Sequence, residues 1–238
     1  NTLKLFLESL SELEQNALEV KTSTTSFIED ALLKKHTTNN PNYIPGDLNN
    51  ECLPYKINFS AYCSDFYLTK FDTDNIKLIC HEYLKGLQWV INYYRKGMPD
   101  WKWSYPFFYA PFLKELSNHV DTFGTDSVGG IIFEKNTPLN IFTQLLAVMP
   151  PSCSYLLPTP LDTIISSNTN NYYPHTFNID CSGKRKEWEG IVILPLVNVD
   201  VIEKEYERRS SLITEKDMKR CYVDKSRIYT FSQNPKKT

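Results

Sequence analysis

The chain has 238 residues, enough for one large domain or two small ones. Hydrophobic residues make up 41% of it and aromatic residues 13%, so an intrinsically disordered protein is excluded and large rings are available to fill a core. The formal net charge of −2 excludes a protein that binds nucleic acid through an overall basic surface, so any phosphate contact must be local or depend on another part of the protein.

The first part of the chain is predicted to contain an amphipathic helix followed by a loop. Apolar residues recur at steps of three and four between residues 3 and 20, which is the spacing of one face of a helix. Residues 36–50 are rich in Asn, Thr and Pro and include Pro45-Gly46, so they should form a loop or linker. We place the best internal boundary of the chain in this stretch.

A second helix is predicted within residues 71–94, where apolar side chains again follow helical spacing. Three residues at its start each carry a side-chain oxygen that could accept a hydrogen bond from the free amides of the first turn: Asp72, Thr73 and Asp74. Gly97 and Pro99 should end the helix, since neither continues one readily.

Residues 101–112 are the densest aromatic cluster of the chain and are called the aromatic block below. Pro106 and Pro111 exclude a regular helix across it, so we expect an ordered but irregular segment. The faces of Trp101 and Trp103 could stack on the bases of a single nucleic-acid strand without reading their identity. Packing in a core is the commoner use of such rings, and composition alone favours it.

Basic side chains near the aromatic block could contact phosphate groups. The candidates are Arg95, Lys96 and Lys102. A separate basic run at residues 184–186 could also touch phosphate, but we interpret it as an exposed turn between two strands.

The second half of the chain carries signals for further helices and two strands. Helix starts are predicted at Thr137-Pro138, near Pro160, and in a capping box at 214–217. Strands are predicted over 177–179 and 190–196, although the second could be a buried helical turn. Residues 168–171 should form a polar loop and the tail after Gln233 should be frayed.

The chemistry-bearing residues do not form a self-contained active site by sequence. The six cysteines contain no C-x-x-C pair, and nothing completes a zinc pattern with Cys80-His81, so we expect reduced thiols. Glu187 and Glu189 could reach one metal ion from a strand, but two-metal phosphodiester cleavage needs several converging carboxylates, and surface ion pairs are the better interpretation. The longest apolar run is too short to span a membrane.

Several stretches, read in order, resemble the Xrn/Rat family of 5′→3′ exoribonucleases. Residues 83–97 resemble the family's helix that ends in a tyrosine run and a glycine, and the aromatic block resembles its Trp-x-Trp-Tyr-Tyr-Pro-x-His-Tyr-Ala-Pro signature. The segments that resemble later parts of the family are 138–158, 173–174, 177–180, 183–195 and 212–220.

Order and spacing agree with the family over residues 71–231, and the helix at 3–20 is similar to the end of its first conserved region. Three positions depart from the pattern: Ser104 replaces a Tyr, Phe108 a His, and Cys221 an Asn. The change at Phe108 removes any polar role of that position but not its packing role.

The resemblance implies a mixed α/β fold, helix-dominated with a few strands, that is part of a larger nuclease core. Residues 1–35 would be the helical end of the first conserved region, 36–70 a linker or loop, and 71–238 the second conserved region. The first residue is Asn1, so we expect the chain to begin inside a longer protein.

The function that the resemblance implies is processive degradation of 5′-monophosphorylated RNA to mononucleotides, as in mRNA decay. Family members hold Mg²⁺ with a carboxylate cluster in the first conserved region, so the cofactor of the full-length enzyme would not bind to this chain. Trp101 or Trp103 would stack on the substrate. The implied partners are single-stranded RNA and the N-terminal catalytic region of the same protein, with no membrane.

The short linker favours the cytoplasmic Xrn branch, with a nuclear location as the alternative. Two other functions stay open: a catalytically inactive module that binds single-stranded RNA or protein, and a purely structural partner. In the first, substitution of Trp101 or Trp103 would weaken binding, whereas in the second it would change stability alone.

Overall fold

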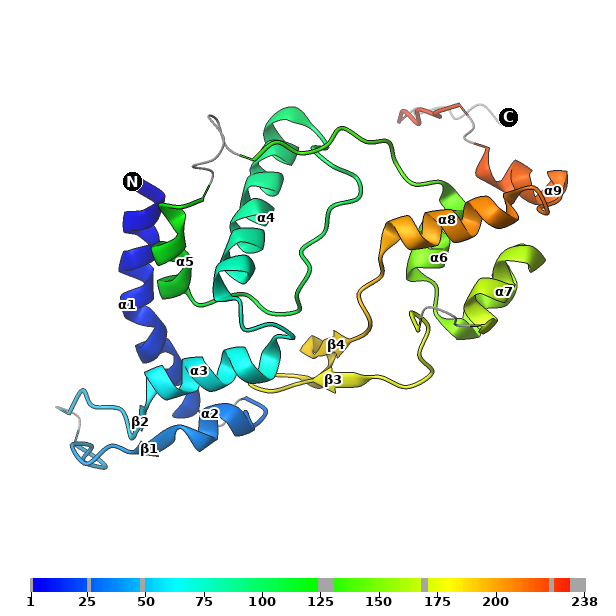
Figure 1. Ribbon diagram of the computed structural model, residues 1–238. Helices are drawn as coiled ribbons and strands as arrows, with labels where there is room; N and C mark the ends of the chain where they lie inside the picture. Colours follow the sequence, from blue (N-terminus) through cyan, green and yellow to red (C-terminus); the bar gives the residue numbers. More distant parts are fainter. Residues whose placement is uncertain are drawn as a thin grey trace. The chain divides into compact units, whose positions relative to one another are not determined.

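The computed structural model describes residues 2–24, 27–47, 50–123, 131–167, 171–222 and 225–231. Within these ranges helices dominate, and the strands form two small antiparallel pairs (Figure 1). The prediction of a helix-dominated mixed α/β fold is therefore confirmed. The chain divides into two compact units, the first made of Asn1–Pro138 with His175–Leu196 and the second of Leu139–Pro174 with Val197–Thr238.

The first unit carries the aromatic block. Its helices are α1 (Thr2–Thr22), α2 (Ala31–Lys35), α3 (Phe59–Lys70), α4 (Ile76–Lys96), α5 (Leu113–Val120) and the 3₁₀ helix η2 (Glu187–Glu189). Its strands are β1 (Thr37–Asn39), which pairs antiparallel with β2 (Tyr55–Ile57), and β3 (Asn178–Asp180), which pairs antiparallel with β4 (Ile191–Ile193). The registers place Thr38 opposite Lys56 and Ile179 opposite Val192.

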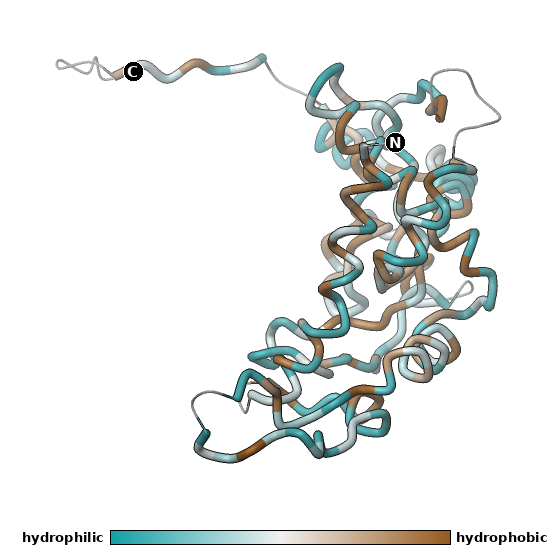
Figure 2. Tube along the Cα trace, turned by 90° about the vertical axis from the view of Figure 1, so that its left-hand side faces the viewer, coloured by the Kyte–Doolittle hydropathy of each residue, from teal (hydrophilic) through white to brown (hydrophobic). Residues whose placement is uncertain are grey.

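Helix α1 confirms the helix predicted over residues 3–20, but the apolar face that was predicted is largely exposed, with Phe6 58% and Leu13 59% exposed. It packs beside α5, which in turn packs against α4 (Figure 1). Hydrophobic and hydrophilic stretches alternate along its trace in Figure 2, and Leu7 on its inner face is buried with Cys80, Leu84 and Leu116. This three-helix contact is one of the small cores that hold the first unit together.

A second core joins α3 to the aromatic block. Tyr67 and Phe71 are buried at the end of α3, and Phe107, Tyr109 and Phe112 pack against this region. The ring centroids of Phe71 and Phe107 lie 5.6 Å apart, and those of Tyr67 and Phe112 lie 5.9 Å apart, both edge to face. The later part of the aromatic block is therefore core packing, as composition alone suggested.

Helix α4 confirms the second predicted helix but begins later than expected. Its cap is Asn75, whose side chain accepts from the Leu78 amide at 3.1 Å, and not one of the three residues named for this role, Asp72, Thr73 and Asp74. The helix ends as predicted at Gly97, which has a φ of 89° that glycine adopts without strain.

The stretch 36–70, predicted as a linker or loop, contains β1, β2 and α3. Loop structure holds only for parts of residues 36–50, and Asn58 starts α3 by accepting from the Ala61 amide. The aromatic residues of α3 follow helical spacing, because Phe59, Tyr62, Phe66 and Tyr67 stand at positions i, i+3, i+7 and i+8, and both tyrosines are buried. The prediction of a linker or loop over 36–70 overlooked this helix signal.

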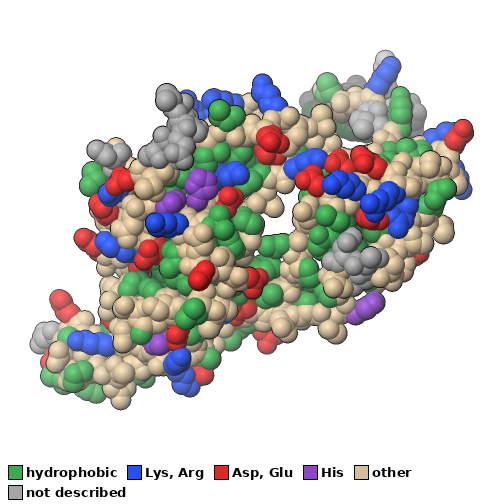
Figure 3. Space-filling model, in the orientation of Figure 1, with side chains coloured by type: hydrophobic (Ala, Val, Ile, Leu, Met, Phe, Trp, Pro, Cys, Tyr) green, Lys and Arg blue, Asp and Glu red, His purple; other side chains and the backbone are tan. Residues whose placement is uncertain are grey.

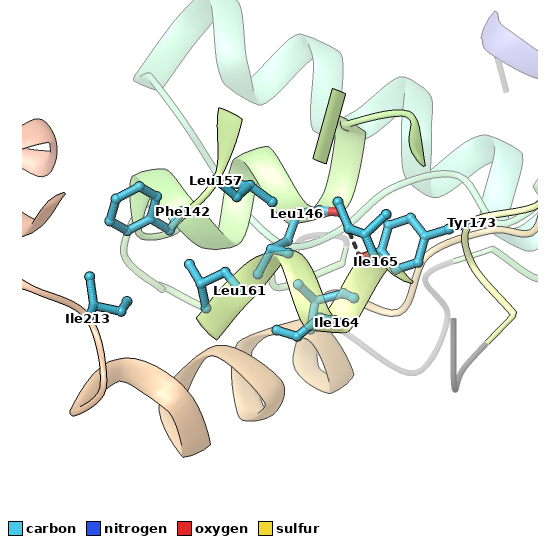
Figure 4. Packing of buried hydrophobic residues seen from close by; sticks show 9 residues of the cluster. Phe142, Leu146, Leu157, Leu161, Ile164, Ile165, Tyr173 and Ile213 are labelled. Carbon is cyan, nitrogen blue, oxygen red and sulfur yellow. Dashed lines mark hydrogen bonds between the residues drawn. The ribbon is translucent and has the colours of Figure 1, made fainter. Parts of the chain in front are cut away.

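The second unit is built from helices: α6 (Ile141–Val148), η1 (Pro151–Leu156), α7 (Thr159–Ser167), α8 (Val199–Ser210), α9 (Glu215–Met218) and η3 (Lys219–Cys221). Its core gathers apolar side chains from α6, α7 and α8, including Ile202 of α8. Leu146 and Leu161 of the same core are labelled in Figure 4. The Tyr173 hydroxyl donates to the Leu146 carbonyl at 2.9 Å, so this buried phenol is satisfied.

Several predictions in the second half need correction. Helix α6 starts after Asn140, whose side chain accepts from the Phe142 amide, and not at Thr137-Pro138. Helix α8 was not predicted at all. The helix near Pro160 and the cap at Thr214 are confirmed as α7 and α9. Of the predicted loop at 168–171, residues 168–170 lie outside the described residues, and the tail after Gln233 lies outside them entirely.

The two predicted strands are confirmed as β3 and β4, although both are short. The basic run at 184–186 lies between them, as interpreted from the sequence. Glu187 and Glu189 belong to the 3₁₀ helix η2 rather than to a strand, so the strand geometry that would aim both carboxylates at one ion does not occur.

Candidate functional site

The candidate site is the loop that follows α4, where the aromatic block begins. Asp100 organises this loop, because its Oδ1 accepts hydrogen bonds from the backbone amides of Lys102 at 2.8 Å and Trp103 at 3.0 Å. Its own carbonyl accepts from the Trp89 indole of α4 at 3.0 Å. The loop is thus fixed to the helix at one point and folded around one carboxylate.

Trp103 is packed against α4. Its indole Nε1 donates to Glu82 at 3.2 Å, and Lys85 lies 5.5 Å from its ring centroid in a cation–π contact. A Cβ atom added at Gly86 would lie 3.1 Å from Cη2 of the ring, so the indole lies directly on the helix backbone there. The ring of Phe133 meets it edge to face. These contacts hold the ring on several sides.

Trp101 has a different environment from Trp103. The residue is 45% exposed, while its backbone amide donates to Asn136 Oδ1 at 2.7 Å. The side chain is therefore accessible although its backbone is held. Of the two candidate stacking residues, Trp101 is exposed and Trp103 is partly buried.

The aromatic surface continues along α4. Trp89 and Tyr93 are stacked, with ring centroids 5.5 Å apart and an interplanar angle of 8°. Tyr94 meets Tyr93 edge to face at 5.3 Å and is largely exposed. The loop that carries Trp101 therefore joins an aromatic surface that extends toward the C-terminal end of α4.

The three basic candidates lie at this end of α4 or in the loop. Arg95 and Lys96 are exposed on the last turn of α4, and Lys102 is partly buried. Figure 3 shows Lys and Arg side chains intermixed with Asp and Glu on the face it presents, in keeping with the net charge of −2. Phosphate contacts would therefore be local, as the sequence indicates.

The polar residues that fix the loop, Asp100 and Asn136, were not predicted. Pro99-Asp100 is a turn signal that could have identified Asp100, because Asp side chains often accept from amides two and three residues on. Asn136 has no local signal, since its partner Trp101 lies 35 residues earlier in the chain.

The buried cysteine thiols and His119 lie in surroundings that favour a structural role. Burial raises the pKa of the Cys63 and Cys80 thiols to about 12, so both are protonated and poor nucleophiles. Burial, and then the neighbouring His81, lower the pKa of His119. All six cysteines are free, as expected. Over the described part of the chain, no group of three or more His, Cys, Asp or Glu residues is placed to hold a metal ion.

Comparison with known proteins shows the family to which the chain belongs. A family model described as the Xrn1 helical domain matches residues 55–238, well over half of the chain. This chain belongs to the Xrn1 helical domain family. The resemblance to the Xrn/Rat exoribonucleases seen in the sequence is therefore confirmed.

Curated relatives agree with this assignment. The chain is 33% identical over 155 residues to "5′-3′ exoribonuclease 2" of Debaryomyces hansenii, covering 64% of this chain and 15% of the relative. It is 29% identical over 226 residues to the protein of the same name in Yarrowia lipolytica, covering 88% and 21%. It is 32% identical over 154 residues to human "5′-3′ exoribonuclease 1", covering 60% and 8%.

The chain spans about a fifth or less of the length of these relatives. The Xrn family members named here are nucleases of RNA, and the present chain corresponds to their helical region. None of the described helices is both long and apolar enough to cross a membrane.

Proposed function

We propose that this chain is the substrate-holding and scaffold segment of a 5′→3′ exoribonuclease that processively degrades 5′-monophosphorylated RNA to mononucleotides. The observation that carries the proposal is the exposed ring of Trp101 on a loop whose backbone is fixed by hydrogen bonds. An indole face stacks on any base, which suits digestion without regard to sequence. The names of the relatives support RNA as the substrate.

The cutting chemistry belongs, in this proposal, to an N-terminal catalytic region of the same protein. The described residues do not fit a Mg²⁺ site, because no group of three metal-ligating side chains converges among them. Mg²⁺ would therefore be held by the carboxylates of that other region, and this chain would contribute the surface on which the RNA end rests.

Arg95, Lys96 and Lys102 are proposed to contact the phosphates of the same strand. Arg95 and Lys96 lie on the last turn of α4, directly before the loop of Trp101, and both are exposed. A cation beside a stacked base would meet the backbone of a single strand without reading its sequence. In this proposal Trp103, which packs against Glu82 and Lys85, supports this surface.

The division of the chain and its location in the cell are also proposals. Residues 1–35 would complete the first conserved region and 71–238 would form the second. A cytoplasmic location in mRNA decay, with a nuclear location as the alternative, stays a prediction that localisation of the tagged full-length protein would test.

The function is tested by comparing the full-length protein with the 238-residue chain on 5′-monophosphorylated single-stranded RNA in the presence of Mg²⁺. We expect the full-length protein to release mononucleotides from the 5′ end and the isolated chain to release none. Robust magnesium-dependent hydrolysis by the isolated chain would contradict the proposal. RNA binding without hydrolysis by the full-length protein would instead favour the inactive binding module.

A further inference from the structure

The loop that carries Trp101 is connected to a segment far away in the sequence. Asn136 accepts from the Trp101 amide through Oδ1 and donates to Asp100 Oδ1 through Nδ2 at 2.6 Å. The same Asp100 oxygen receives the amides of Lys102 and Trp103. Three consecutive backbone amides are therefore held by two side chains that are bonded to each other, a pair that we call the Asp100–Asn136 clamp.

The segment that supplies Asn136 is itself fixed to α4. The Gln88 side chain donates to the Ile131 carbonyl at 3.0 Å and accepts from the Ile131 amide at 3.2 Å. The ring of Phe133 meets Trp103 edge to face at 6.1 Å. Asn136 therefore lies on a segment whose backbone is hydrogen-bonded to α4 at Ile131.

The hydrogen bonds around Asp100 favour the ionised form of its carboxyl group. Burial opposes its ionisation, but the hydrogen bonds from Asn136 and from the amides of Lys102 and Trp103 outweigh it, so the pKa of Asp100 is below its ordinary value. At neutral pH the carboxylate accepts all three hydrogen bonds.

We propose that Asp100 and Asn136 are positioning residues for RNA, which hold the Trp101 ring in the exposed orientation in which it stacks on a base. The clamp reaches only backbone atoms and leaves the indole free, so it fixes where the ring projects without covering it. A ring whose backbone is already ordered loses less conformational freedom when it binds a base. This inference rests on the proposed stacking role of Trp101.

A double-mutant cycle in the full-length protein tests the clamp, with the KM for 5′-monophosphorylated single-stranded RNA as the readout. Asn136→Ala and Asp100→Ala should each raise KM by about two- to tenfold with little change in kcat, which corresponds to the net worth of one to two hydrogen bonds. In the Trp101→Ala background, neither substitution should raise KM further. Asp100→Asn, which keeps an acceptor oxygen, should restore most of the loss.

Each outcome separates the clamp from the stacking role. If Trp101→Ala leaves KM unchanged, the proposed function of Trp101 fails and the clamp proposal fails with it. If Trp101→Ala raises KM but Asn136→Ala and Asp100→Ala do not, the clamp proposal alone is overturned. An equal rise from Asn136→Ala in both backgrounds also overturns it, because Asn136 would then act elsewhere.

A conservative pair decides the question if the alanine variants do not fold. Asn136→Asp keeps the acceptor for the Trp101 amide but sets two carboxylates against each other, so KM should rise, while Asp100→Asn should leave it near the wild-type value. Equal KM values for these two variants would refute the clamp. Trp188→Ala removes an exposed tryptophan outside the loop and is the matched control, for which no change in KM is expected.

Discussion

At the scale of single residues, the two tryptophans of the loop have different surroundings and should respond differently to substitution. Trp103 contacts Glu82, Lys85 and the backbone at Gly86, so Trp103→Ala should lower the free energy of unfolding by roughly 2–4 kcal/mol. Trp101→Ala should lower it by less than about 0.5 kcal/mol, because its ring is exposed.

Urea unfolding of both variants measures this difference. Trp188→Ala again serves as the control for loss of an exposed indole. A Trp101 variant as destabilised as the Trp103 variant would show that the Trp101 ring is structural, and would contradict its assignment to a ligand.

A second residue-scale feature is the partly buried carboxylate of Asp180. Lys70 pairs with it, the Tyr109 hydroxyl donates to it at 2.6 Å, and the Ser182 amide donates at 3.0 Å. Burial opposes its ionisation, but these three donors outweigh burial and hold the pKa of Asp180 far below its usual range. The carboxylate thus joins α3, the aromatic block and β3.

The depressed pKa of Asp180 predicts how stability varies with pH. The unfolded-state pKa of an Asp is about 3.9, so the stabilisation from ionised Asp180 is complete above that value and is lost as the pH falls through it toward the folded-state pKa. We expect Asp180→Asn to lower the free energy of unfolding by roughly 2 kcal/mol at pH 7, and by progressively less below about pH 4.

Denaturant unfolding of the wild-type protein and Asp180→Asn between pH 3 and pH 8 checks this prediction. Asp74→Asn, an exposed carboxylate near the start of α4, is a suitable control. A stability difference that stays constant below pH 4 would mean that the charge of Asp180 does not matter.

Residue chemistry alone could not separate packing rings from accessible rings in the aromatic block. The sequence identified the cluster and both candidate tryptophans, but Phe107 and Phe112 have the same local composition as the start of the block and are core residues. What distinguishes Trp101 is its exposure, and exposure is set by tertiary structure and not by neighbours in the chain.

At the scale of elements, the two long helices α1 and α4 were predicted from the spacing of their apolar residues, and α9 begins at the predicted cap Thr214. A local cap was not sufficient, because α8 was missed although Asn198 accepts from the amides of Asp200 and Val201. Helix α5 was missed because its start has no side-chain cap of its own. Its first amides are instead bound by a distant residue, since Glu14 of α1 accepts from Leu113 at 2.7 Å and Lys114 at 3.3 Å.

This tertiary cap makes a testable prediction. Glu14→Ala should lower the free energy of unfolding by about 1 kcal/mol, as loss of a helix cap does, because the amides at the start of α5 lose their acceptor. Glu14→Gln keeps a side-chain oxygen and should cost less. Urea unfolding of both variants measures the effect, and an equal loss from alanine and glutamine would argue against a capping role.

At the scale of the whole molecule, the family assignment accounts for features that the chain alone does not explain. The described residues bring together no metal-ligating group, yet the relatives are nucleases that are roughly four times as long as this chain. The sequence supplied this assignment through the order of several motifs, whereas the boundary predicted at residues 36–50 does not coincide with the two compact units. Those units are not continuous in sequence, so no local change in composition marks them.

A substitution in the core of the second unit serves as a control for loss of stability in experiments on the loop. Its core is separate from the aromatic block, and Leu161 within it is fully buried. Leu161→Ala should lower the free energy of unfolding by roughly 2–5 kcal/mol. Its effect on RNA binding, measured well below the unfolding transition, separates losses of general stability from losses at Trp101.

The central claim is that the Trp101 ring holds RNA by stacking, and equilibrium binding of 5′-monophosphorylated single-stranded RNA to the full-length protein without divalent metal tests it most directly. Trp101→Ala should weaken binding by about five- to a hundredfold, the usual worth of one base–aromatic stack, while Trp101→Phe should retain most of the affinity. Wild-type affinity for Trp101→Ala, or equal losses in Trp101→Phe and Trp101→Ala, would contradict the claim.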